Sequence, residues 1–216
     1  MSTATMTASH ASSAPGAPRF TLPKFGMLVF LASEAMLFAG LIGGYIVLRL
    51  AQGPGNWPPP GAPDIGIQMP PTFLNWVMIV NTVILLSSSL TYHWGEASMR
   101  KGKSGLLGYG ITAVLGAIFL GVQAWEWLHL KHEGMWFNTF GIYGSCFFTM
   151  TGFHGAHVFL GLVAILYVVG RAIFRQMQLF SGQTPKGSHT CEELTGYYWH
   201  FVDVVWIFLY GILYVL

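Results

Sequence analysis

Residues 140–174 read FGIYGSCFFTMTGFHGAHVFLGLVAILYVVGRAIF, and this run decides the class of fold. Its one formally charged side chain, Arg171, lies near its end. A transmembrane helix needs about 20 predominantly apolar residues to cross the hydrocarbon core of a bilayer, so the run is long enough to span. Because it is continuous, without the short alternating polar and apolar segments of a membrane barrel, it predicts a helix.

Four further apolar runs of similar length flank this one, at residues 25–50, 73–94, 106–130 and 195–216. Together the five runs predict an all-α, polytopic membrane bundle of five transmembrane helices over residues 23–216. Residues 1–22, rich in Ser, Thr, Ala and Pro, predict a disordered cytoplasmic tail. Residues 52–72 are rich in Pro and Gly and predict a stiff, non-helical loop.

The composition agrees with a membrane protein and excludes other classes. Hydrophobic residues make up 53% of the 216 residues and charged residues only 8%, against about 25% charged in an average soluble domain. Such a chain has too few polar groups for the surface of a secreted enzyme, a nucleic-acid binder or a disordered protein. The two cysteines, Cys146 and Cys191, are too few for a disulfide framework.

The distribution of Lys and Arg predicts the orientation in the membrane. If the five runs span in turn, eight basic residues fall on one side and two, Arg49 and Lys131, on the other. Because positive residues accumulate in cytoplasmic loops, we expect the N-terminus inside and the C-terminus outside. The eight residues on the inner side are Arg19, Lys24, Arg100, Lys101, Lys103, Arg171, Arg175 and Lys186.

Ionisable residues inside the predicted spans are candidate functional residues. Each costs at least about 2.5–3.5 kcal/mol to insert at bilayer depth, so such groups usually pair or face the protein interior. His154 and His157 are three residues apart and should share one helix face, and His200 and Asp203 repeat this spacing. Interhelical hydrogen bonding that fixes the bundle and proton or ion handling both remain open. The six candidates are Glu34, Glu126, His154, His157, His200 and Asp203.

Catalytic and metal-binding motifs are largely missing from the sequence. Glu126 and His129 form one Glu-x-x-His, whereas a di-iron bundle needs two copies with further glutamates. A mixed site built from Glu34, His154 and His157 stays open, but no spacing fixes it. Haem-attachment, phosphate-loop and serine-nucleophile motifs do not occur. We therefore expect no catalytic, cofactor-binding or metal-ligating residue in this chain, with a di-iron membrane enzyme as a remote alternative.

The glycine positions indicate where helices can pack closely, and the tryptophan positions indicate where the helices cross the membrane interfaces. A G-x-x-x-G pair, Gly40 and Gly44, and the glycines 152, 155 and 161 predict close helix contacts. A general enrichment of glycine in membrane helices would explain them equally well. Four tryptophans fall near the predicted membrane–water interfaces, where we expect their rings to fix the depth of the helices in the bilayer. They are Trp57, Trp94, Trp127 and Trp136.

Several motifs resemble one known family, subunit III of the haem-copper oxidases. Residues 143–158, YGSCFFTMTGFHGAHV, resemble its signature, and Glu193 followed by YWHFVDVVW at 198–206 resembles its C-terminal motif. Shorter matches are Ser33-Glu34 with Met36-Leu37-Phe38, Trp57-Pro58-Pro59, Asn81-Thr82 with Leu85-Leu86-Ser87-Ser88, and Gln123 with Glu126. The resemblance extends from about residue 25 to the C-terminus.

This resemblance implies an accessory, cofactor-free subunit of a proton-translocating cytochrome c oxidase in a bacterial inner membrane. It would contact catalytic subunit I directly, with subunit II in the same complex and haem and copper in those partners. Family members bind phospholipid in a cleft, support proton uptake and protect the catalytic subunit during turnover. By resemblance, Glu34 is the buried glutamate near the proton-uptake side and His157 lies near it.

This chain departs from the longer family members in one respect. They have seven helices and this chain matches the last five, so the lipid cleft is less complete here.

Two alternatives remain to the cytochrome c oxidase subunit that the resemblance implies. Five-helix forms also occur among quinol oxidases, although Glu34 and the 198–206 motif look more like the cytochrome c branch. A stand-alone proton or ion transporter is the alternative from a different class, motivated by Glu34, Glu126, His157 and Asp203.

Overall fold

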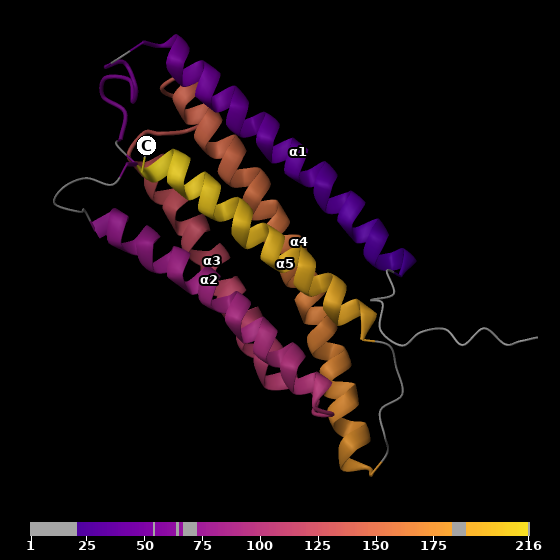
Figure 1. Ribbon diagram of the computed structural model, residues 1–216. Coiled ribbons are helices and arrows are strands. Elements are labelled where there is room, and N and C mark those ends of the chain that lie inside the picture. The colour runs from indigo at the N-terminus through magenta and orange to yellow at the C-terminus, as the bar shows by residue number, and fades with distance from the viewer. Residues whose placement is uncertain (1–20, 54, 64, 67–72, 183–188, 216) are drawn as a thin grey trace, which may run out of the picture.

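The structure is a computed structural model that describes residues 21–53, 55–63, 65–66, 73–182 and 189–215. It contains five long helices, each apolar enough to cross a membrane, and no strand within these residues. This confirms the predicted all-α bundle with five spans (Figure 1). The helices are α1 (Leu22–Ala51), α2 (Phe73–Arg100), α3 (Leu106–His132), α4 (Ile142–Phe180) and α5 (Thr190–Tyr210), followed by the π-helical turn η1 (Gly211–Val215).

The helix ends differ from the ends of the predicted spans. The apolar run covers only the part of a helix that lies in the lipid layer, and the helix continues beyond it. The helix α4 runs six residues past the predicted end at 174, and α2 continues to Arg100. The helix α5 begins at Thr190, five residues early, with Glu192 and Glu193 in its first turn, where the helix dipole favours acidic groups. The helix α1 begins at Leu22, the last residue assigned to the tail, because Pro23 suits the first helical turn.

The tail and the loop are only partly described. Residues 1–20, which carry the predicted disordered tail, lie outside the described residues. The described part of 52–72 is not helical beyond a turn, as predicted. In this loop Trp57 follows the α1 end, donates its indole N–H to the Tyr45 hydroxyl at 3.2 Å and lies edge-on to Tyr143. The Trp57–Pro58 peptide bond is cis.

Glycines bring some helices together, though not at all the predicted positions. A Cβ added at Gly108 of α3 would lie 2.5 Å from the backbone of Gly95 in α2, so these two backbones are in direct contact. Gly161 of α4 is packed against Trp199 of α5, as expected of a close approach. At Gly40 and Gly44, by contrast, an added Cβ would meet nothing within 4 Å. The predicted close contact at this G-x-x-x-G is therefore wrong within the described chain.

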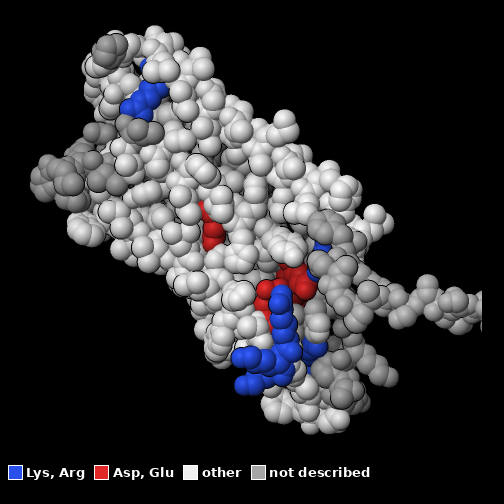
Figure 2. All heavy atoms as spheres, viewed as in Figure 1, with Lys and Arg blue, Asp and Glu red and all other residues white. Residues whose placement is uncertain are grey.

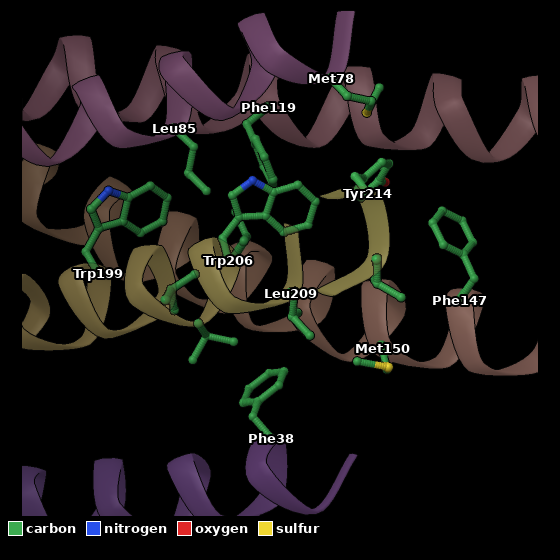
Figure 3. Packing of buried hydrophobic residues seen from close by; sticks show 14 of the residues in the cluster. Phe38, Met78, Leu85, Phe119, Phe147, Met150, Trp199, Trp206, Leu209 and Tyr214 are labelled. Carbon is green, nitrogen blue, oxygen red and sulfur yellow. The ribbon is translucent and has the colours of Figure 1, made fainter. Parts of the chain in front are cut away.

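The core lies between α2, α3, α4 and α5, and two tryptophans of α5 occupy its centre (Figure 3). Trp199 and Trp206 are fully buried, and their indole N–H groups donate to Ser88 at 2.9 Å and to Thr82 at 3.1 Å. Both acceptors belong to α2, so each ring packs apolar surface while its polar atom is satisfied across a helix contact. Phe38 reaches this core from α1.

The Lys and Arg side chains of the described residues lie at the two ends of the bundle, whereas three acidic residues, Glu34, Glu126 and Asp203, lie within the spans. Ion pairs join the start of α5 to the start of α1 and to α2 and α4 near their ends: Lys24–Glu193 at 2.6 Å, Arg100–Glu193 at 4.0 Å and Arg171–Glu192 at 3.1 Å. Figure 2 shows most of the visible Lys and Arg gathered around acidic groups at this end. We call it the basic end. That it faces the cytoplasm stays a prediction from the charge bias.

Candidate functional site

Glu34 of α1 and His157 of α4 form an ion pair within the spans. The Glu34 Oε2 atom lies 2.9 Å from Nε2 of His157, and the two side chains are 19% and 13% exposed. Phe38, one turn along α1, packs edge-on against the imidazole with ring centroids 5.0 Å apart. The pairing implied by the family resemblance is therefore present in the geometry.

This contact holds one transferable proton. His157 Nδ1 lies 2.7 Å from the Phe153 carbonyl, which can only accept, so Nδ1 carries a hydrogen. The Nε2–Glu34 contact then needs one further hydrogen, either on the imidazole or on the carboxyl group. Pairing lowers the cost of burying both groups, and it also leaves a proton that can move between two atoms 2.9 Å apart.

His200 and Asp203 of α5 are joined through Ser89 of α2. Ser89 Oγ lies 2.8 Å from His200 Nδ1 and donates a hydrogen bond to Asp203 Oδ2. Since a hydroxyl has one hydrogen to donate, His200 Nδ1 must donate to Ser89. The expected proximity of His200 and Asp203 is present, but the two side chains meet through a third residue that the spacing argument did not include.

Glu126 is the most deeply buried carboxyl group of the six candidates, with no exposed surface. It accepts a hydrogen bond from Gln123, one turn away on α3. The Tyr214 hydroxyl in η1 lies 2.8 and 3.0 Å from its two oxygens. The π-helical turn thus ties the end of α5 to α3 through a buried carboxyl group.

His154 does not act with His157, which corrects the expectation that the two share a face. It points into the core, is fully buried and stacks on Trp206 with ring centroids 4.8 Å apart. Phe119 lies edge-on to it, and neither ring nitrogen has a hydrogen-bond partner among the described residues. Residues three apart on a helix differ by about 60° in direction, which is enough here to aim them at different neighbours.

Metal ligands do not converge in the described part of the chain. No three His, Cys, Asp or Glu side chains lie close enough there to hold an ion. The mixed site considered from Glu34, His154 and His157 is not formed, because His154 faces Trp206.

Sequence reasoning missed three partners of the candidate residues. Ser89 and Tyr214 carry ordinary polar groups of the kind found throughout membrane helices, and Tyr198 donates to the His157 carbonyl at 3.1 Å. The run of three serines at 87–89 inside an apolar span was the one available signal. Nothing in the sequence singled out Tyr214.

A cavity of ≈ 480 Å³ with a mixed polar and apolar lining lies near the basic end, between the end of α4 and the ends of α2, α3 and α5. Arg171 is neutralised there by Glu192, whereas Arg175 donates to the neutral acceptor Nδ1 of His189 at 3.1 Å. No carboxylate within the described residues lies within 4.0 Å of Arg175, and its Nε is buried without an acceptor among them. The cavity therefore presents a net positive charge beside the apolar rings of Tyr167 and Phe174.

The comparisons with known proteins all match one family. A family model described as cytochrome c oxidase subunit III matches residues 5–216. The chain is 40% identical over 193 residues to cytochrome c oxidase subunit 3 of Thermostichus vulcanus, covering 88% of this chain and 86% of that protein. It is 40% identical over 192 residues to a probable cytochrome c oxidase subunit 3 of Nocardia farcinica, with 88% and 85% covered. The Struthio camelus protein of the same name is 33% identical over 198 residues, which cover 68% of its length.

Proposed function

We propose that this chain, which belongs to the cytochrome c oxidase subunit III family, is the non-catalytic subunit of a proton-translocating oxidase. In this proposal it contacts catalytic subunit I directly, shares the complex with subunit II and lies in a bacterial inner membrane. Haem and copper belong to the partner subunits and none to this chain. The family match over 5–216 carries the proposal.

The contribution of this chain to the reaction is to hold protons and to stabilise the catalytic subunit. The Glu34–His157 contact supports the first role, because it binds one proton that can shift between the two side chains. In this role the pair sustains proton uptake from the cytoplasmic side. The polar clusters around Glu126 and Asp203 have a structural role and no proton-handling role in this proposal, because their hydrogen bonds link one helix to another.

The decisive experiment is purification of the native complex through an affinity tag on this chain. We expect haem and copper to co-purify and the complex to oxidise reduced cytochrome c. Oxidation of quinol without oxidation of cytochrome c would move the chain to the quinol-oxidase branch. Absence of haem from the preparation, with proton flux by the isolated chain in vesicles, would replace the proposal with a stand-alone transporter.

The variant Glu34→Gln tests the proton role. The amide keeps the shape of the side chain but cannot take up the carboxylate charge, so we expect normal assembly and a near-normal initial rate. Activity should then decline several-fold sooner during continuous turnover. Glu133→Gln is the matched control, since Glu133 is a 46% exposed carboxylate at the opposite end of the bundle from the basic end. Failure of Glu34→Gln to assemble would assign Glu34 a structural role.

We also propose that the cavity at the basic end holds the phosphate of an anionic phospholipid. Arg175 supplies the positive charge, and the exposed rings of Tyr167 and Phe174 continue as an apolar surface for an acyl chain. A charge-assisted hydrogen bond contributes about 1.5–3 kcal/mol, so Arg175→Gln should weaken lipid binding roughly tenfold or more. Mass spectrometry of phosphatidylglycerol retained by the purified complex measures this. Arg100→Gln, which alters an ion-paired arginine outside the cavity, should retain the lipid.

A further inference from the structure

One face of α1 leads from the Glu34–His157 pair to a groove near the end of the bundle opposite the basic end. Glu34, Phe38, Leu41 and Tyr45 follow one another at intervals of three or four residues and therefore share this face. The groove has a volume of ≈ 640 Å³ and is lined by Leu41 and Tyr45 from α1 and by the start of α4 from the other side. On this face Phe38 is the one residue between the pair and the groove.

The Phe38 ring fills the space on the groove side of the pair. Phe38 is only 3% exposed, and Figure 3 shows it pointing from α1 into the bundle. Its ring lies edge-on to the His157 imidazole at 5.0 Å and is tilted against Phe201 of α5 at 6.5 Å, between ring centroids. Since a phenyl ring can neither donate nor accept a proton, Phe38 and Phe201 form an apolar layer between the pair and the groove.

The side of the pair toward the basic end has a different lining. Tyr198 lies on this side, because it precedes Phe201 on α5 and α5 begins at the basic end. Its hydroxyl donates to the His157 carbonyl at 3.1 Å, which places a polar group next to the pair. Phe30, one turn before Glu34, stacks on Tyr198 but is itself 44% exposed. The surroundings of the pair are therefore polar and partly open toward the basic end, and apolar and buried toward the groove.

We propose that Phe38 is a positioning residue for the proton of the Glu34–His157 pair: its ring closes the pair to the groove, so that the proton exchanges only with the basic end. A proton-uptake role requires such one-sided exchange, because a pair open to both ends would let protons return across the membrane. The inference rests on the proposed function, since it presumes the proton role of the pair. Phe38 thereby acquires a task beyond packing.

Thiol labelling of the native complex in sealed vesicles of defined orientation measures which end has access to the pair. Glu34→Cys places a thiol at the position of the carboxyl group, and a membrane-impermeant maleimide reacts with the thiolate form, which needs water. With Phe38 in place we expect the introduced thiol to react from the basic end and not from the opposite end. Addition of Phe38→Ala should raise its labelling rate from the opposite end at least tenfold, measured by mass spectrometry of peptides from this chain.

Two further positions serve as controls. Cys146 lines the groove and should react from the opposite end in every variant, which shows that the reagent reaches the barrier. Phe30→Ala removes a phenyl ring one turn from Glu34 on the other side and should leave labelling from the opposite end unchanged. Phe38→Leu keeps the space filled and should keep the barrier closed. Phe38→Val opens a smaller gap, should give an intermediate rate, and replaces Phe38→Ala if that protein does not accumulate.

The outcomes separate this inference from the function on which it rests. If opening the space at Phe38 leaves labelling from the opposite end unchanged while Cys146 reacts, Phe38 is a packing residue only. The inference also fails if the introduced thiol reacts from the opposite end with Phe38 in place, if it does not react from the basic end, or if Cys146 is not labelled. None of these measurements depends on haem, so absence of haem from the unaltered complex would reject the proposed function separately.

Discussion

Replacing Tyr214 with phenylalanine should lower the stability of the bundle by about 1–3 kcal/mol, although the change removes only one oxygen atom. The Tyr214 hydroxyl donates to Glu126, and both side chains are almost completely buried. In the variant, Gln123 is the one remaining hydrogen-bond donor to this carboxyl group among the described residues. A buried polar group without its partner costs more than the hydrogen bond contributed, because water cannot replace the lost donor.

Thermal denaturation of the detergent-solubilised complex measures this loss. Tyr197→Phe is the matched control, since Tyr197 lies in α5 and is 43% exposed, and it should melt with the wild type. The triple variant Tyr214→Phe/Glu126→Leu/Gln123→Leu should recover part of the loss, because it removes the carboxyl group together with both of its hydrogen-bond donors. A Tyr214→Phe protein as stable as the wild type would show that Glu126 does not depend on this contact.

The five spans could be predicted from the sequence because a helix must present about 20 apolar residues to cross the hydrocarbon core of the bilayer. The ends of the helices could not, since the chain stays helical after it leaves the apolar layer. Arg100 and Phe180 end their helices beyond the predicted spans, and Glu192 lies before the predicted start of α5. Arg100 and Glu192 at these helix ends form ion pairs with neighbouring helices. Contacts between helices cannot be read from the hydropathy of a single run.

The candidate residues were recognisable because ionisable groups are expensive inside a membrane, but their partners were not. Spacing along one helix predicted that His154 and His157 share a face, whereas the contacts place one against Trp206 and the other against Glu34. Partners such as Ser89 lie on other helices, at positions set by the packing of the whole bundle. Local periodicity therefore identified the groups that need a partner and could not identify the partner.

Removal of the Asp203 carboxyl group should destabilise the bundle more than the neutral change Glu34→Gln. Asp203→Ala deprives Ser89 of its acceptor and leaves the hydroxyl in a partly buried contact between α2 and α5. Interhelical hydrogen bonds in membrane proteins contribute about 0.6 kcal/mol on average and up to about 1.7, and the cavity left by the side chain adds to this. We expect a total loss of about 2 kcal/mol, measured as lower chain accumulation and a lower melting temperature.

The variant Asp203→Asn separates the hydrogen bond from the charge. Its amide oxygen can still accept from Ser89, so a structural role predicts near-normal stability for Asp203→Asn and a clear loss for Asp203→Ala. His200→Ala should resemble the alanine variant, because it removes the donor to the same hydroxyl. If both alanine variants accumulate and melt like the wild type, the cluster does not hold α2 to α5. Equal damage by Asp203→Asn and Asp203→Ala would show that the charge, and not the hydrogen-bond geometry, is what the bundle requires at this position.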